Sequence, residues 1–138
     1  MIAATFPDPE AALIAHLDAA LTATVSTTFP QTAILAPHVQ VELEAGDDND
    51  YPVTERAQVR VTCHGPSSYP SGSGKSSRTE VKALASLARA HAVTLRSAAV
   101  SGVFPRGGRS GVIKDPDTGN LMCWFLVRVD LKATLLAS

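Results

Sequence analysis

The chain has 138 residues, of which 45% are hydrophobic, 18% are charged and 5% are aromatic. This composition is typical of a globular domain and excludes a disordered or fibrous protein. A chain of this length supports one hydrophobic core, so we expect a single domain over 1–138 and exclude a large multidomain enzyme. With 12 Lys and Arg against 13 Asp and Glu, the chain lacks the net charge that usually accompanies binding to nucleic acids or membrane surfaces.

The charges are nevertheless separated along the chain. Residues 42–55 hold six acids and no base, whereas residues 75–109 hold seven bases and one acid. Such runs are ordinarily two solvated faces. They also suit head-to-tail association, in which the acidic surface of one copy meets the basic surface of the next and a ring closes.

We expect no secretory signal and no membrane-spanning segment. The N-terminus lacks a basic start followed by an apolar run and a cleavage site. The longest strongly apolar run, 121–127, is far shorter than the ~20 residues that cross a bilayer. Cys63 and Cys123 are the only cysteines, and we expect both thiols to be free in a reducing compartment.

The first element predicted is a helix over about 9–25. Asp8 can cap it, Pro9 suits its first position, and Glu10 favours the positive end of the helix. The residues that then recur at helical spacing are Leu13, Ile14, Leu17, Ala20, Leu21 and Val25. Threonines and prolines break the pattern that follows.

From His38 the hydrophobic period changes to two, which predicts half-buried strands over 38–44 and 57–64. The segment between them is rich in turn formers, so an antiparallel hairpin is the simplest pairing. Its outer face would carry opposite charges. A loop rich in Gly, Pro and Ser follows, and then a helix that begins with the capping-box spacing of Ser77 and Glu80 and ends near 94.

The C-terminal part predicts a strand at about 98–104, a short run at 112–114 and a last strand over 121–132. Odd positions of the last strand are all apolar and belong on a core face. Met122, Trp124 and Leu126 make the first half of the opposite face apolar too. Something should cover them: either a helix of the same chain or a neighbouring subunit, because Trp and Met are enriched at contact surfaces.

The expected fold is therefore α+β, with the order α-β-β-α-β-(β)-β. We expect an antiparallel or mixed sheet of four to five strands with two main helices packed on it. Flexible loops are predicted at about 45–53, 64–76 and 105–111, where few apolar residues are available for packing.

The chain offers little catalytic chemistry. Residues 71–76 end in Gly-Lys-Ser, but a phosphate-binding loop needs a Gly where the chain has Tyr69, and Pro70 removes a backbone donor. Histidines are scattered without metal-ligand spacing, and both thiols fall on predicted core faces. We therefore expect no enzyme, no metal and no cofactor. A small cytoplasmic nucleotide-binding protein stays as a minor alternative.

Several segments together resemble the tail terminator proteins of long-tailed siphophages. In chain order they are a Pro-Asp-Pro-Glu helix start at 7–10, leucines at 13, 17 and 21, a His-Val-Gln-Val-Glu-Leu strand at 38–43, a Glu-Arg-Ala-Gln-Val-Arg-Val-Thr-Cys strand at 55–63, a capped helix at 77–94 and a Cys-Trp-Phe-Leu-Val-Arg-Val-Asp-Leu strand at 123–131. The composition, rich in Ala, Thr and Val, is similar to that of phages of actinobacteria. The resemblance covers roughly residues 8–132.

The resemblance implies a structural virion protein at the neck end of the tail, present in the host cytoplasm during assembly. Such a protein forms a hexameric ring, caps the tail tube protein, stops tube polymerisation and presents the surface that joins the head through its connector or stopper. Genomic DNA passes through the ring without sequence-specific binding, and neither a cofactor nor a membrane is needed. A head-tail connector, a stopper or another neck ring component is the nearest alternative.

The candidate contact residues come from the chain itself. We expect Asp47, Asp48 and Asp50 to face a lumen or a neighbour, and Arg106 and Arg109 to reach an acidic partner. The apolar group of the last strand, Met122, Trp124 and Leu126, is the third candidate contact.

Overall fold

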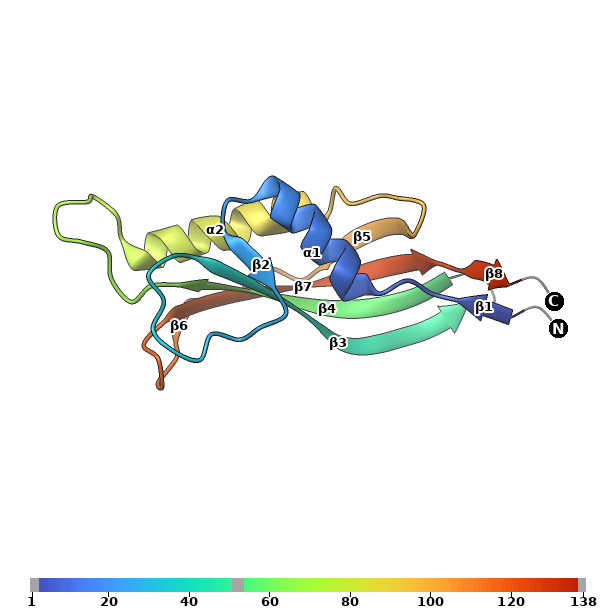
Figure 1. The fold of residues 1–138 in the computed structure, drawn as a ribbon, viewed down its shortest axis with the longest axis horizontal. Coiled ribbons are helices and arrows are strands. Elements are labelled where there is room, and N and C mark those ends of the chain that lie inside the picture. The colour runs from blue at the N-terminus through green and yellow to red at the C-terminus, as the bar shows by residue number, and fades with distance from the viewer. Residues whose placement is uncertain (1–2, 51–53, 137–138) are drawn as a thin grey trace.

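The computed structural model describes residues 3–50 and 54–136, and describes side chains for 5–44 and 55–133. Its elements in chain order are β1 (Ala3–Thr5), α1 (Pro9–Ala20), β2 (Thr24–Ser26), β3 (His38–Asp50), β4 (Thr54–Gly65), α2 (Ser77–Ala92), β5 (Val100–Arg106), β6 (Ile113–Lys114), β7 (Leu121–Lys132) and β8 (Thr134–Leu136). Figure 1 shows both helices on one side of a long twisted sheet.

The main sheet has six strands in the order β2-β3-β4-β7-β5, with β6 beside β7. All neighbours are antiparallel except β2 and β3, which run parallel. Strands β1 and β8 form a separate antiparallel pair near the two termini (Figure 1). The predicted α+β class with two helices on a mixed sheet is confirmed, although the sheet has more strands than the four to five expected.

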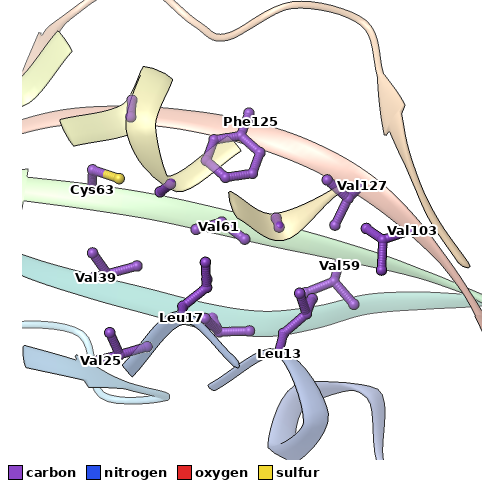
Figure 2. Close-up of a cluster of buried hydrophobic side chains, with 14 of the residues drawn as sticks. Leu13, Leu17, Val25, Val39, Val59, Val61, Cys63, Val103, Phe125 and Val127 are labelled. Carbon is purple, nitrogen blue, oxygen red and sulfur yellow. The ribbon is translucent and has the colours of Figure 1, made fainter. Parts of the chain in front are cut away.

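The core lies between the two helices and one face of the sheet. Odd positions of β7 are buried throughout, as are odd positions of β4 from Ala57 to Cys63. Helix α1 contributes Leu13 and Leu17, both completely buried, and Figure 2 shows them directed at the middle strands. Helix α2 contributes mainly alanines, whose small side chains let it lie close to β4 and β7. The face predicted for the core is therefore the face that the helices cover.

The first helix begins as predicted but is shorter. Asp8 caps it by accepting hydrogen bonds from the N–H groups of Glu10 and Ala11, at 2.9 and 3.4 Å. The helix ends at Ala20 rather than near Val25, because the chain turns there and continues as β2. Residues 24–26 instead pair in parallel with the first residues of β3.

The second helix also departs from its expected ends. Its N-cap is Ser76 rather than Ser77, and the Ser76 side chain makes no capping hydrogen bond. The N–H of Glu80 donates to the Ser76 carbonyl oxygen at 2.9 Å, so backbone geometry alone sets the first turn. The helix ends at Ala92, two residues before the predicted position.

The predicted loops are all shorter than expected because strand pairing extends into them. Strand β3 continues through residues 45–50, β4 continues through His64 and Gly65, and β5 includes Pro105 and Arg106. Irregular pairing between Leu43 and residue 49 marks where β3 bends to accommodate its turn-forming residues. The tip of the hairpin, residues 51–53, lies outside the described residues.

Candidate functional site

The predicted apolar contact group lies on the sheet face that points away from both helices, which we call the open face. Met122, Trp124 and Leu126 occupy alternate positions of β7 and are half-buried, whereas the residues between them are buried in the core. Both helices pack on the opposite face (Figure 1). The expectation that a helix of the same chain covers this group is therefore wrong, since the apolar stripe of each helix is used on the core side.

One end of the open face is covered by residues 27–37, which we call the strap. Its Phe29 ring meets the His64 ring edge-on, with centroids 5.1 Å apart. The N–H of Ile34 donates to Asn120 Oδ1 at 3.0 Å, and the amide nitrogen of Asn120 donates to a strap carbonyl oxygen at 3.0 Å. The strap is thus fixed to β4 and to the start of β7.

A buried polar cluster lies beneath the strap. His64 Nε2 donates to Gln40 Oε1 at 3.2 Å, and both side chains are buried. Burial, with a smaller contribution from the nearby His38, lowers the pKa of His64 to about 4, and the carboxylate of Asp115 acts in the opposite direction. His38 Nε2 lies 3.1 Å from Ser26 Oγ and 2.9 Å from a strap carbonyl oxygen. This cluster holds the strap in place, with His64 uncharged at neutral pH.

The sequence pattern does not predict this cluster. The histidines follow no metal or catalytic spacing, but His38 and His64 stand directly opposite each other in the β3–β4 register. Pairing the first residue of the predicted strand 38–44 with the last residue of the predicted strand 57–64 would have placed these two histidines together. The strap itself carries no periodic pattern, so its position could not be predicted.

Beyond the strap, Arg60 lies across the centre of the open face. Its guanidinium carbon is 5.6 Å from the centroid of the Trp124 ring. Its Nε donates to Glu44 Oε2 at 2.9 Å, which confirms the opposite charges predicted for the outer face of the hairpin. Contacts of a cation with an exposed ring contribute about 0.5–1 kcal/mol. The pair therefore orients Trp124 and neutralises one acid of residues 42–55.

A second arginine packs on an aromatic ring nearer the β5 edge. The Arg128 guanidinium carbon is 4.6 Å from the centroid of the Phe104 ring, and Arg128 Nε donates to Asp130 Oδ1 at 2.9 Å. Phe104 is 42% exposed despite this contact. The open face is thus amphipathic, with aromatic rings under arginines whose charges are paired with acids, a surface suited to a protein partner.

The two predicted arginines lie on or just after β5, away from the predicted aspartates on β3. Arg106 is exposed and lies beside Leu126 in the β5–β7 register. Arg109 is exposed in the loop after β5, next to Ser110, whose N–H donates to the Trp124 carbonyl oxygen at 2.7 Å. The register therefore places Arg106 beside the apolar contact group, and the bond of Ser110 places the backbone next to Arg109 beside β7.

The predicted aspartates lie at the other side of the sheet. Asp47, Asp48 and Asp50 belong to the far half of β3, which is separated from β5 by β4 and β7. Their side chains lie outside the described residues.

The loop before α2 borders an open cavity of about 480 Å³, whose lining includes Lys75, Arg78 and Lys114. Its backbone donors are used within the loop: the N–H of Ser73 donates to the Pro70 carbonyl oxygen at 3.1 Å, and the N–H of Lys75 donates to Ser73 Oγ at 3.3 Å. A phosphate cradle instead directs several N–H groups at one anion. The loop geometry thus differs from that of a nucleotide-binding loop.

The two cysteines are neighbours on the core face of the sheet. Cys63 and Cys123 are register partners on β4 and β7, and both are fully buried as free thiols. Cys123 Sγ donates to the Ser110 carbonyl oxygen at 3.3 Å. Burial, with a smaller contribution from Cys123, raises the pKa of the Cys63 thiol, so little nucleophilic thiolate forms.

Across the described parts of the chain, no group of three or more His, Cys, Asp or Glu residues is arranged to hold a metal ion. Neither helix is long and apolar enough to cross a membrane. No protein-family profile matches the sequence, and no curated protein matches it significantly. The function is therefore inferred from the geometry of the chain and from the resemblance in its sequence.

Proposed function

We propose that the chain is a structural virion protein, a tail terminator of a long-tailed siphophage, and not an enzyme. It assembles into a homo-oligomeric ring, caps the tail tube at the neck end, stops tube polymerisation and provides the surface to which the head connector binds. Hexameric symmetry comes from the resemblance, and DNA passes through the ring without sequence-specific contacts.

The open face is the observation that carries this proposal. Met122, Trp124 and Leu126 remain half-buried on the side opposite both helices, and the strap covers only the end of this face near His64. Half-exposed apolar side chains that are surrounded by paired charges are typical of a surface that another protein covers. A subunit that is completed by its neighbours has this organisation.

The experiment compares single substitutions on the two sides of the sheet. Trp124→Ser and Leu126→Ser remove apolar groups from the open face, and Leu87→Ser is the matched control because Leu87 is 50% exposed on α2. Circular dichroism and urea unfolding first establish that each variant is folded. Native mass spectrometry then measures ring formation, and electron microscopy counts capped ends on tail tubes of the phage that carries the gene.

We expect the wild type and Leu87→Ser to cap tubes, and the two open-face variants to lose capping by at least about tenfold. Binding of the wild type to the portal-side connector instead of the tube would overturn the terminator assignment in favour of a connector or stopper. Failure to bind either structure would refute the virion role. Equal capping by all variants would show that the open face is not the contact.

A further inference from the structure

The sheet ends in two edges that lack a neighbouring strand over similar lengths. Strand β2 pairs only with residues 38–40 of β3, so in the described chain residues 41–50 have no strand on their outer side. At the other edge, β5 pairs with β7 and with no other strand of the described residues. Exposed strand edges are ready to pair with another chain unless something protects them.

These two edges stand at the same level of the sheet. The register runs straight across the strands in three rows: Arg106–Leu126–Arg60–Glu42, Val103–Val129–Ala57–Gly46 and Val100–Leu131–Glu55–Asn49. The residues of β5 therefore lie level with residues 42–49 of β3, the stretch that β2 leaves open.

The strand directions also fit a repeated arrangement. Each of the pairs β3–β4, β4–β7 and β7–β5 is antiparallel, so β3 and β5 run in opposite directions. A second copy displaced sideways, without a shift along the strands, places its β5 antiparallel to β3 of the first copy. Such a contact joins two different surfaces and closes into a ring when each copy is rotated slightly relative to the last.

At each edge a charged side chain binds a backbone group of the strand, and the two side chains have opposite charges. On β3, the N–H of Leu43 donates to Glu10 Oε2 at 2.7 Å. On β5, Arg96 Nη1 donates to the Ser101 carbonyl oxygen at 3.2 Å. One edge thus carries carboxylates and the other carries guanidinium groups.

The row that begins with Arg106 supplies a specific pair. Glu42 is exposed and makes no ion pair with the described residues, because Arg60, its register partner, binds Glu44 instead. Arg106 lies in the same row and therefore on the same face of the sheet. Directly opposed residues on antiparallel strands have Cβ atoms about 4.5–5.5 Å apart. In the repeated arrangement, Arg106 of one copy faces Glu42 of the next at this separation.

We propose that copies of this chain associate head to tail through the two sheet edges, with β5 of one copy beside residues 42–49 of β3 in the next. The inference rests on the proposed ring function and identifies the subunit contact. Backbone hydrogen bonds are interrupted at this contact. Pro105 on β5 lies in the same register row as Leu43 on β3 and lacks an N–H, and the Leu43 N–H already donates to Glu10. Side chains therefore select the partner. The Arg106–Glu42 ion pair is the central contact.

Charge reversal tests this pairing. Glu42→Arg places two positive groups opposite each other, and Arg106→Glu places two negative groups there, so each variant alone should associate at least about tenfold more weakly than the wild type. A mixture of the two variants restores an opposite pair at every contact of an even-membered ring. The double variant E42R/R106E restores it for any ring size.

Matched controls are Asp18→Arg on α1 and Arg78→Glu on α2, both exposed and outside the three register rows that carry the proposed contact. Ring formation is measured by native mass spectrometry after circular dichroism has confirmed that each variant is folded. We expect rings from the wild type, both controls, the mixture and the double variant, and subunits from each edge variant alone.

The outcomes separate the two proposals. Rings from either edge variant alone, or no recovery in the double variant, would overturn the edge contact even if the wild type caps tail tubes. Rings that obey the charge rule but bind no tail tube would support the contact and refute the terminator function. A wild type that forms no rings, even on tubes, would refute both.

Discussion

His64 makes the stability of the fold depend on pH. The side chain is 1% exposed, and burial lowers its pKa to about 4 from the ordinary 6.5. Between these values the unfolded chain binds a proton that the folded chain does not, so unfolding becomes more favourable as the pH falls. The contribution of neutral His64 to stability is complete above about pH 6.5 and is lost progressively toward pH 4.

The magnitude follows from the size of the pKa shift. Each pKa unit corresponds to about 1.4 kcal/mol, so the shift of His64 is worth about 3 kcal/mol when fully expressed. About 2 kcal/mol of this should be lost between pH 7 and pH 5. Urea unfolding at pH 5, 6 and 7 measures this loss as a fall in the free energy of unfolding.

Two variants isolate the contribution of His64. His64→Gln keeps an N–H donor near Gln40 but does not titrate, so its stability should fall about 2 kcal/mol less than that of the wild type between pH 7 and pH 5. His91→Gln, at a partly exposed position on α2, should retain the wild-type dependence. A histidine NMR titration gives an independent reading on the unmodified chain. Equal losses in wild type and His64→Gln, or a His64 midpoint near 6.5, would refute the argument.

The helix cap and the buried thiols give two further tests. Asp8→Ala removes the acceptor of two N–H groups at the start of α1 and should lower the free energy of unfolding by about 1 kcal/mol in a urea titration; an unchanged value would show that the cap contributes nothing. Cys63 and Cys123 are both 0% exposed, so a thiol reagent at pH 8 should label them only after urea is added. Rapid labelling of the folded chain would contradict their burial.

The elements that sequence predicts best are those in which one pattern dominates. Strand β7 has the predicted bounds, 121–132, because every odd position from Leu121 to Leu131 is apolar, and a period of two sustained over this length indicates a strand. The end of α1 was mispredicted because Leu21 and Val25 continue the helical spacing. Both side chains are indeed buried, but Leu21 is the C-cap of α1 and Val25 belongs to β2. The spacing therefore predicted their burial correctly and their backbone conformation wrongly.

The hairpin shows tertiary pairing prevailing over local preference. Residues 45–50 are turn formers, yet they extend β3 opposite β4, with irregular register where the strand bends. Similarly, Ser77 and Glu80 have the spacing of a capping box, but the helix starts one residue earlier and the box does not form. Local propensity thus predicts that a turn or a helix cap lies nearby, whereas packing and strand pairing determine its exact position.

The candidate site was predictable in its parts and not in its arrangement. The apolar even positions of β7 and the charged runs are visible in the sequence. Their relation depends on the strand order, which places β3 and β5 at opposite edges with β4 and β7 between them. The sequence pattern gave no signal for the contacts of Glu10 and Arg96. Glu10 accepts from a backbone N–H of another element, 33 residues along the chain, and Arg96 reaches the Ser101 carbonyl oxygen only through the bend between them.

The near balance of charge bears on how copies of this chain would pair through the proposed edge contact. When the β3 edges of two copies pair, the carboxylates of Glu42 and Glu10 in one copy meet those of the other. When two β5 edges pair, the guanidinium groups of Arg106 and Arg96 meet in the same way. Like charges directly opposite on neighbouring strands are destabilising, so both symmetric pairings are disfavoured. Only the unlike pairing of β3 with β5 brings opposite charges together, and this pairing leaves a free edge at each end of every open chain of subunits. Under the proposed edge contact, growth therefore stops only when the rotation between copies closes a ring, and a rotation that does not close gives an open filament instead.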